Sequence, residues 1–264
     1  MSDYIANEQV IERVMEKARI HGAQFLPSDA NRITAAGPFT SIDHVLAECE
    51  TSFRQLVHLT HLDPSSRVLD YGSGIGRMAV PFKFFLSDAG DYVGVDIMKE
   101  AVEGCQKRFS GEANFEFRHI NLYNKMYNPQ GSASCEDLPI TLPRSRDVAF
   151  MFSIATHLLP GTIEPVMQAV SSALRPGGEL LVSFFLLNAR VREAIAAGRT
   201  TRTFAHTYSD GVCVDVKETP EGAVAYEDSE ARAVLEQAGL EIVFTAPGKW
   251  SSPGGLPICH QDLI

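Results

Sequence analysis

The sequence has no long apolar segment, no surplus of basic residues and no paired cysteines. Its N-terminus is charged throughout, so we expect neither a signal peptide nor a membrane span, but a cytoplasmic protein. Its five cysteines include no Cys-x-x-Cys pair, which indicates reduced thiols. The formal net charge of −10 disfavours broad binding to nucleic acid. Only His58 and His61 are spaced like metal ligands, and without further ligands we expect no metal site.

The stretch Arg67 to Pro81, RVLDYGSGIGRMAVP, has the pattern of a strand, a loop and a helix. Val68 and Leu69 form a short apolar run of the kind found in a strand buried on both faces. Glycines at 72, 74 and 76 allow positive φ angles and let a ligand approach the backbone. Free N–H groups at the start of a helix favour a carboxylate or phosphate. The stretch therefore predicts a nucleotide site, and the alternative is a glycine-rich turn that binds nothing.

The glycine spacing separates the possible nucleotides. A dinucleotide fingerprint, G-x-G-x-x-G, would place its third glycine at position 77, which is Arg77 here. A P-loop would end in Gly-Lys-Ser/Thr, which is also missing. An acidic residue followed by G-x-G-x-G resembles the first motif of class I S-adenosyl-L-methionine (SAM) dependent methyltransferases. This resemblance implies that the loop backbone packs against the methionine part of SAM, with Asp70 near its ammonium group.

Two further positions fit an adenosine site. Asp96 ends the next predicted strand, DYVGVDI, and a carboxylate there can accept hydrogen bonds from both ribose hydroxyls. Asn121 follows the predicted strand Phe115 to Ile120. Many SAM enzymes have an aspartate at that place, and it binds the adenine amino group. The carbonyl of an asparagine can accept the same hydrogen bond.

Strands and helices alternate along the rest of the chain, which is typical of a parallel α/β sheet. We expect an N-terminal helical extension over residues 1–40 and a catalytic domain over 41–264, with an insertion at about 199–228. Further strands are predicted at Asp147 to Phe152, Glu179 to Leu186, Leu240 to Ala246 and Ile258 to Ile264. The amphipathic stretch over residues 4–20 could cover the active site, the domain core or a partner subunit, so a homodimer is one assembly that it allows.

Segments along most of the chain resemble a group of bacterial class I methyltransferases. They are VLDYGSGIGR, YVGVDI, the YNP-G stretch at Tyr127, FSIATHLLP, LRPGGELLVSFF and the closing AGLEIV, GKW and QD. The resemblance implies a Rossmann-like, seven-stranded, mostly parallel sheet with an antiparallel last strand. It also implies that SAM binds across the carboxyl ends of the strands and leaves as S-adenosyl-L-homocysteine. The cofactor-binding residues that we expect are Asp70, Tyr71, Gly72, Ser73, Gly74, Arg77, Asp96, Ile97, Asn121, Leu122, Phe152 and Ser153.

The candidate for proton removal is His157, which lies just beyond the predicted strand at 147–152. A histidine titrates near neutral pH and can take a proton from a hydroxyl acceptor. The other interpretation, which the sequence favours, is that His157 bonds to backbone and fixes the entry of the next helix. His206, Tyr208 and Asp210, in the polar insertion, are alternative candidates. We expect Phe39, Tyr127, His157, His206 and Tyr208 to line the substrate pocket.

The predicted activity is SAM-dependent transfer of a methyl group to a small molecule, with a hydroxyl of a glycosidic or other secondary metabolite as the expected acceptor. DNA amino-methyltransferases have an Asn/Asp-Pro-Pro-aromatic tetrapeptide where this chain has Phe152-Ser153-Ile154-Ala155. The alternatives that stay open are a protein or peptide methyltransferase and an NAD-dependent Rossmann oxidoreductase, the second disfavoured by Arg77.

Overall fold

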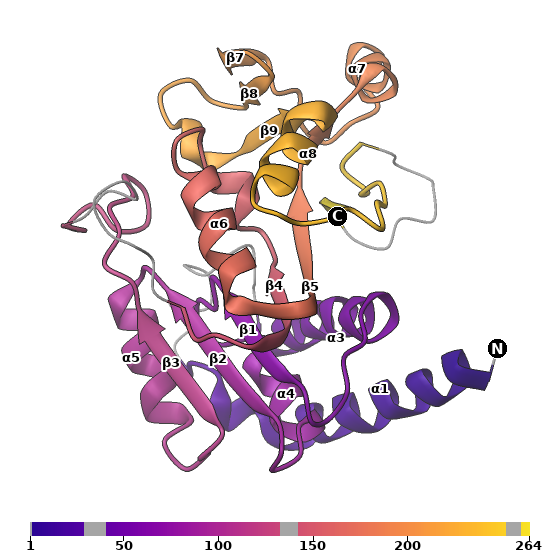
Figure 1. The fold of residues 1–264 in the computed structure, drawn as a ribbon, viewed down its shortest axis with the longest axis vertical. Helices are drawn as coiled ribbons and strands as arrows, with labels where there is room; N and C mark the ends of the chain where they lie inside the picture. The colour runs from indigo at the N-terminus through magenta and orange to yellow at the C-terminus, as the bar shows by residue number, and fades with distance from the viewer. Residues whose placement is uncertain (1, 29–40, 133–141, 252–259) are drawn as a thin grey trace. The chain divides into compact units, whose positions relative to one another are not determined.

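A computed structural model describes residues 2–28, 41–132, 142–251 and 260–264 of the chain (Figure 1). The chain divides into two compact units. Unit 1 consists of Met1–Asn121, Pro143–Phe150 and Leu174–Glu179, and unit 2 of Leu122–Leu142, Met151–Ala173 and Leu180–Ile264. Phe39 lies outside the described residues.

Four parallel strands form the centre of unit 1. They are β1 (Arg67–Tyr71), β2 (Asp91–Asp96), β3 (Phe115–His119) and β4 (Arg146–Met151). β1 lies between β2 and β4, with Asp70 opposite Gly94 on one side and Phe150 on the other. Apolar side chains on both faces of β1 and β2 are buried, as expected for strands covered on both sides. The α/β class predicted from the sequence is confirmed.

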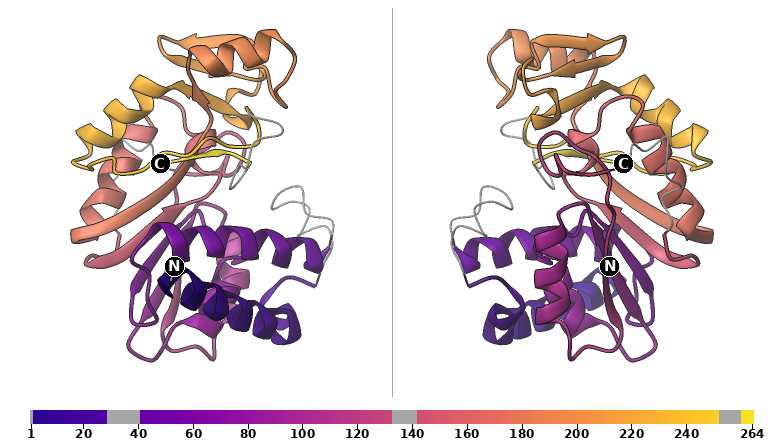
Figure 2. Two further views of the ribbon diagram at one scale, coloured as in Figure 1. Left: turned by 90° about the vertical axis from the view of Figure 1, so that its right-hand side faces the viewer. Right: turned by 90° about the vertical axis from the view of Figure 1, so that its left-hand side faces the viewer.

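The helical segments of unit 1 are α1 (Ser2–His21), η1 (Gly22–Phe25), α3 (Ile42–Leu59), α4 (Ala79–Phe85) and α5 (Lys99–Arg108). Both side views in Figure 2 place indigo α1 and violet α3 to one side of the unit 1 strands. Ser41 caps α3 by accepting a 3.1 Å hydrogen bond from the N–H of His44. The ring of Phe53 on α3 meets Phe82 of α4 edge-on, and Phe82 stacks on Phe150 of β4. These aromatic contacts join the helices to the strands.

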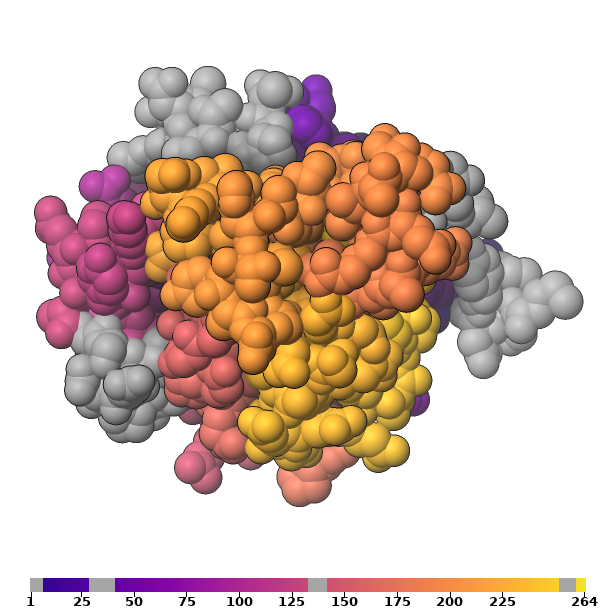
Figure 3. All heavy atoms as spheres, turned by 90° about the horizontal axis from the view of Figure 1, so that it is seen from above, coloured from indigo at the N-terminus to yellow at the C-terminus, as the bar shows by residue number. Residues whose placement is uncertain are grey.

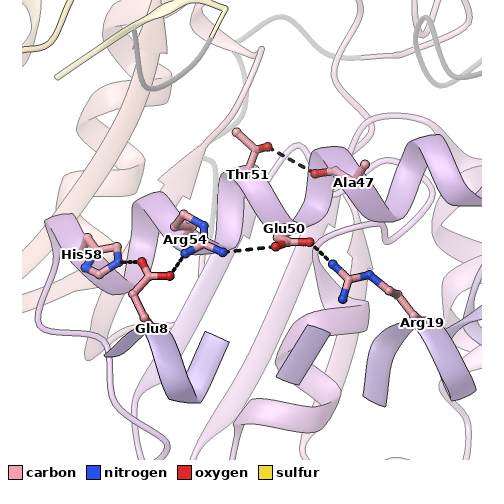
Figure 4. A network of polar contacts seen from close by, with 7 residues as sticks. All are labelled: Glu8, Arg19, Ala47, Glu50, Thr51, Arg54 and His58. Carbon is pink, nitrogen blue, oxygen red and sulfur yellow. Dashed lines mark hydrogen bonds and ion pairs between the residues drawn. The ribbon is translucent and has the colours of Figure 1, made fainter. Parts of the chain in front are cut away.

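A row of ion pairs connects α1 to α3 (Figure 4). The Glu8 carboxylate accepts from the Arg54 guanidinium and lies 2.6 Å from Nε2 of His58. The Glu50 carboxylate accepts from Arg54 at 3.1 Å and also from Arg19. Burial and the Arg54 charge lower the pKa of His58. Two charged residues of α1, Glu8 and Arg19, are therefore paired with α3, while the apolar side of the helix is buried.

Unit 2 contains the remaining elements. They are η2 (Ala155–His157), α6 (Ile163–Ala173), β5 (Leu174–Phe184, beginning in unit 1), β6 (Leu186–Leu187), α7 (Ala189–Ala196), β7 (His206–Ser209), β8 (Val212–Val214), η3 (Pro220–Gly222), β9 (Val224–Glu227), α8 (Asp228–Gln237) and β10 (Asp262–Leu263). β10 pairs antiparallel with β5, as the resemblance implied for the last strand. A second sheet has the order β6-β9-β8-β7.

The strand predicted at 240–246 is not a strand in the structure. Its backbone is joined to β10 only by an isolated bridge between Ala246 and Leu263, and Val243 is 84% exposed. The described residues therefore give a six-stranded main sheet where seven strands were expected. β10 has two residues, so it offers little backbone for a further strand to pair with.

The segment over 199–228 forms the β7–β8 hairpin, η3 and β9. β8 is buried, while most of β7 is exposed. Figure 3 shows this orange segment on the surface of unit 2. A buried cluster under the hairpin includes Phe185, Phe204 and Trp250. The indole N–H of Trp250 donates a 2.7 Å hydrogen bond to Asp262, which anchors the cluster to β10.

None of the helices in the described ranges is both long and apolar enough to cross a bilayer. The thiols of Cys49, Cys105 and Cys213, which fall in those ranges, are free and buried. Burial raises the pKa of Cys49 to about 11 and that of Cys105 to about 12, so both stay protonated at neutral pH.

Candidate functional site: the glycine loop after β1

The loop after β1 is shaped by glycines with positive φ. These angles are +90° at Gly72, +52° at Gly74 and +79° at Gly76, a region that other residues avoid. The N–H groups of Gly72 and Ser73 donate to the Val95 carbonyl at 2.8 and 3.0 Å. The loop is thereby tied to the carboxyl end of β2, where ligands bind in open α/β sheets.

Space around the loop differs from glycine to glycine. A Cβ added to Gly76 would lie 2.8 Å from Sγ of Cys105, and one added to Gly94 of β2 would lie 2.9 Å from Cβ of Ser73. These two glycines are needed for close packing. A Cβ on Gly74 would have no heavy atom of the described part of the chain within 4 Å. The backbone at Gly74 therefore borders open space, where a ligand can approach it.

The Asp96 carboxylate, at the end of β2, is hydrogen-bonded to the glycine loop. Its Oδ2 accepts a 2.7 Å hydrogen bond from the N–H of Gly74, and its Oδ1 accepts one from Met98 at 2.7 Å. Burial raises the pKa of Asp96, while these N–H donors oppose the shift. A carboxylate has about four acceptor sites, so Asp96 keeps acceptor capacity for a ligand hydroxyl beside its bonds to Gly74 and Met98.

Ser73 carries a polar atom without a partner. Its Oγ is buried, and no hydrogen bond to it exists within the described residues. An unmet buried hydroxyl is costly, and a ligand group in the loop would satisfy it. With the open backbone at Gly74 and the acceptor capacity of Asp96, the loop fits a nucleoside cofactor that carries hydroxyl and charged groups.

Asp70 is buried below this loop. Its carboxylate accepts a hydrogen bond from the Tyr92 hydroxyl, and its side chain is within the field of the Arg77 guanidinium. Burial raises the pKa of Asp70 to about 7, although the Tyr92 bond and Arg77 act in the opposite direction. Arg77 itself donates a 3.4 Å hydrogen bond to Ser52 on α3. The proximity of Asp70 to a cofactor ammonium group stays a prediction.

The other predicted cofactor residues are divided between the units. In unit 1, Tyr71 is buried, the Ile97 carbonyl lies 3.1 Å from Nε2 of His119, and Asn121 is exposed two residues after β3 ends. In unit 2, Leu122 is buried and Phe152 half-buried. Their roles as cofactor ligands stay predictions.

Ser153, also in unit 2, lies in a polar cluster after β4. Its φ is +58°, its N–H donates to Oγ of Ser183 at 2.8 Å, and its hydroxyl donates to Oε1 of Gln261 at 3.1 Å. Ser183 donates to the same Gln261 oxygen at 2.6 Å. The cluster fixes the backbone that follows β4, because each of its hydrogen bonds joins residues from different segments.

His157 at the end of η2 has a defined orientation. Its Nδ1 is 2.7 Å from the Glu221 carbonyl oxygen and 3.5 Å from the Tyr127 hydroxyl. The Tyr127 and His157 rings meet edge-on, with centroids 5.5 Å apart. Burial lowers the pKa of His157, and the Arg202 charge adds to this, so the ring is neutral at pH 7. The predicted backbone bond of His157 is therefore present, although it reaches η3 and not the entry of α6.

The structure brings Tyr127 and His157 together, but not all the predicted substrate residues. His206 and Tyr208 are exposed on β7, and within the described residues no hydrogen bond or ring contact joins them to Tyr127 or His157. Phe39 lies outside the described part of the chain.

Several residues of these sites were not predicted from the sequence. Tyr92, Ser183 and Gln261 lie far along the chain from Asp70 and Ser153, which they contact. Glu221 likewise reaches His157 and Asn124 from a distant segment. The only sequence signals were indirect: an Asn-x-x-x-Asn spacing at 124–128 and the closing Gln-Asp pair at 261–262.

Across the described ranges, no group of three or more His, Cys, Asp and Glu residues is placed to hold a metal ion. The two histidines with ligand-like spacing each face a carboxylate instead: His58 lies beside Glu8, and His61 lies 2.8 Å from Glu179.

Comparison with known proteins identifies a family. A family model described as "Methyltransferase domain" matches residues 45–243. The ribosomal protein L11 methyltransferase of Ralstonia pickettii is 28% identical over 141 residues, covering 53% of this chain and 39% of that protein. A non-reducing polyketide synthase of Stereocaulon alpinum is 25% identical over 226 residues, covering 81% of this chain and 8% of the synthase. The chain thus spans well under half the length of these two relatives.

Among solved structures, a SAM-dependent methyltransferase from Leishmania major superimposes with a TM-score of 0.52. It is 16% identical, and the match covers 97% of this chain and 81% of that one. At this level of identity the likeness shows the shared fold. With the family model matching most of the sequence, the chain belongs to the methyltransferase-domain family, whose members are class I, Rossmann-like enzymes that use SAM as methyl donor.

Proposed function

We propose that this chain transfers a methyl group from SAM to a hydroxyl of a small molecule. Bound SAM supplies an electrophilic methyl group on a sulfonium centre. The chain itself has to hold the cofactor, orient the acceptor, exclude water and remove the hydroxyl proton. Family membership supports the donor, and the open, partly unsatisfied loop around Gly74 is the observation that supports its placement.

The glycine loop and the end of β2 are the proposed cofactor site. Asp96 accepts from the ribose hydroxyls with the lone pairs that Gly74 and Met98 leave available. The Ser73 hydroxyl bonds a polar group of the cofactor, which removes the cost of its burial without a partner. The Arg77 guanidinium, fixed against Ser52, provides positive charge for the cofactor carboxylate.

His157 is the proposed proton acceptor. A carbonyl oxygen cannot donate, so the 2.7 Å contact with Glu221 requires a proton on Nδ1 of His157. In the neutral ring Nε2 then has a free lone pair, and within the described residues no hydrogen bond reaches it. Tyr127 beside the ring adds a flat apolar surface with a polar tip, which suits a small hydroxylated acceptor. We include His206 and Tyr208 as residues that reach the acceptor from β7.

A protein acceptor is the second candidate function. The R. pickettii relative is named for a ribosomal protein substrate, whereas the S. alpinum relative is a polyketide synthase. We favour a small molecule because the proposed base is half-buried beside an aromatic ring.

The experiment incubates the purified chain with SAM labelled on the methyl group and with a cell extract separated into protein and small-molecule fractions. Label in the small-molecule fraction is the expected result, and label in protein alone would replace the first candidate by the second. Replacing His157 with Gln should lower turnover by about 10²–10⁴-fold without lowering the affinity for SAM. His206→Gln, at the alternative candidate for proton removal, should lower turnover much less than His157→Gln; a larger loss in His206→Gln would move the proton acceptor to β7. Calorimetry that finds NAD binding and no SAM binding would overturn the cofactor assignment.

A further inference from the structure

Three segments that are far apart in the sequence meet at His157 within unit 2. Tyr127 comes from the loop at 122–131, His157 from η2 and Glu221 from η3. The contact between His157 and Glu221 joins residues 64 positions apart, and that between Asn124 and Glu221 joins residues 97 positions apart. The orientation of the His157 ring is therefore set by tertiary contacts.

Asn124 organises the loop that carries Tyr127. Its Oδ1 accepts hydrogen bonds from the N–H groups of Met126 (3.0 Å) and Tyr127 (2.8 Å), which is an Asx-type turn. Its backbone exchanges hydrogen bonds of 3.2 and 3.0 Å with Asn128. Asn124 is 8% exposed, so these bonds are protected from water. The acceptor atom of this side chain therefore helps to fix the turn that carries Tyr127.

The other end of the same amide is bonded to η3. Nδ2 of Asn124 donates to Oε1 of Glu221 at 3.3 Å. The backbone carbonyl of Glu221 is the group that accepts from Nδ1 of His157. Glu221 therefore bonds to the loop through its side chain and to the histidine through its backbone, and this places the carbonyl that selects the tautomer.

We infer that Asn124 and Glu221 are positioning residues that hold His157 as the Nδ1–H tautomer, so that Nε2 is the proton-accepting atom. Only the role of Nε2 as proton acceptor rests on the proposed function. The tautomer itself follows from donor and acceptor chemistry. Neither residue takes part in the proton transfer; each acts through the orientation of the imidazole.

The groups around His157 are consistent with a neutral ring. Tyr127 lies edge-on against it, and the Arg202 charge disfavours a second proton. From β9, which packs against η2, the Tyr226 hydroxyl donates to the Leu158 carbonyl at 2.7 Å and is thus already engaged. The side-chain carboxylate of Glu221 is bonded to Asn124, and the backbone carbonyl of Glu221 accepts from the imidazole.

The test exchanges donor and acceptor in the Asn124–Glu221 bond. Asn124→Asp keeps the oxygen that accepts from Met126 and Tyr127 but removes the N–H that Glu221 receives, and it sets two carboxylates against each other. Glu221→Gln alone keeps an amide oxygen for Asn124. In the double variant, Asn124→Asp with Glu221→Gln, the glutamine amide can donate to the new carboxylate. Lys125→Ala is the control, because among the described residues the Lys125 side chain bonds to the Glu218 carbonyl alone, at 3.4 Å.

The first readout is the tautomer, measured on the cofactor-free full chain by a two-bond ¹H–¹⁵N correlation spectrum of histidine-labelled protein. We expect the Nδ1–H tautomer for His157 in the wild type, in Glu221→Gln and in Lys125→Ala. Asn124→Asp should give a mixture or the Nε2–H form, and the double variant should restore the Nδ1–H form. Thermal melting of each variant shows that it is folded. An Nδ1–H signal unchanged in a folded Asn124→Asp variant would overturn the inference.

The second readout is turnover. Asn124→Asp should lower kcat by about tenfold or more, because a histidine held in the wrong tautomer cannot accept the proton, with SAM affinity unchanged. The tautomer and turnover measurements show which of the two proposals fails. If the tautomer shifts as expected but His157→Gln keeps full turnover, the positioning role stands and the proton-acceptor role fails. If His157→Gln abolishes turnover but Asn124→Asp leaves the tautomer unchanged, the proton-acceptor role stands and the positioning role fails.

Discussion

Gly74→Ala separates cofactor binding from loop stability. Gly74 has a φ of +52°, and an added Cβ would meet no heavy atom of the described residues within 4 Å. The cost that these residues impose is then that of the left-handed backbone, about 1–2 kcal/mol for a residue with a Cβ. If SAM fills the open space beside Gly74, the same methyl group also collides with the cofactor. An overpacked contact costs about 1–3 kcal/mol, which corresponds to roughly 5- to 150-fold weaker binding.

Gly198→Ala is the matched control for this prediction. Gly198 has a φ of +65°, and its added Cβ, like that of Gly74, would meet none of the described residues within 4 Å; it follows α7 in unit 2 and is not part of the glycine loop. Both variants should melt a few degrees lower, at about 2–4 °C per kcal/mol for a domain of this size. Only Gly74→Ala should lose SAM affinity by calorimetry. Wild-type affinity in Gly74→Ala, or an equal loss in Gly198→Ala, would refute the assignment of this space to the cofactor.

Three further predictions concern buried and paired charges. Asp96→Ala should weaken the binding of SAM by about 1–3 kcal/mol in calorimetry, since the ribose hydroxyls lose their acceptor; unchanged affinity would place the ribose elsewhere. The pKa of Asp70 is raised to about 7, so the native state holds the Asp70 proton more tightly than the unfolded chain does. Proton binding to Asp70 therefore stabilises the fold at low pH, and this stabilisation is lost as the pH rises from about 4 to 7. Asp70→Asn should therefore become more stable relative to wild type across that range in urea unfolding, and a constant difference would contradict the shift. Glu8→Gln, which removes the carboxylate between Arg54 and His58, should cost about 0.2–1 kcal/mol at low salt and less at high salt; an effect independent of salt would argue against a charge contribution.

The sequence determined the elements that depend on neighbouring residues. Apolar runs gave β1 and β2, helical spacing gave α3, and the glycines at 72, 74 and 76 predicted the loop that the structure contains. Periodicity and glycine conformation are local properties, so they can be recognised before any partner is known. The strand at 240–246 was predicted by the same local rule and is not formed, because a strand also needs a partner with free backbone groups.

The tertiary structure decided the chemical state of the site residues. Asp70 and Tyr92 are 22 positions apart, Ser183 and Gln261 are 78 apart, and His157 takes its tautomer from a carbonyl 64 positions away. Neither composition nor spacing indicates such pairs, since each requires two atoms within about 3 Å in a suitable direction. The pKa of Asp70 likewise depends on burial by the folded chain. The residue types that can bind a nucleotide were thus visible in the sequence, while their partners and protonation states follow from packing, which alone brings distant groups into hydrogen-bonding range and removes them from water.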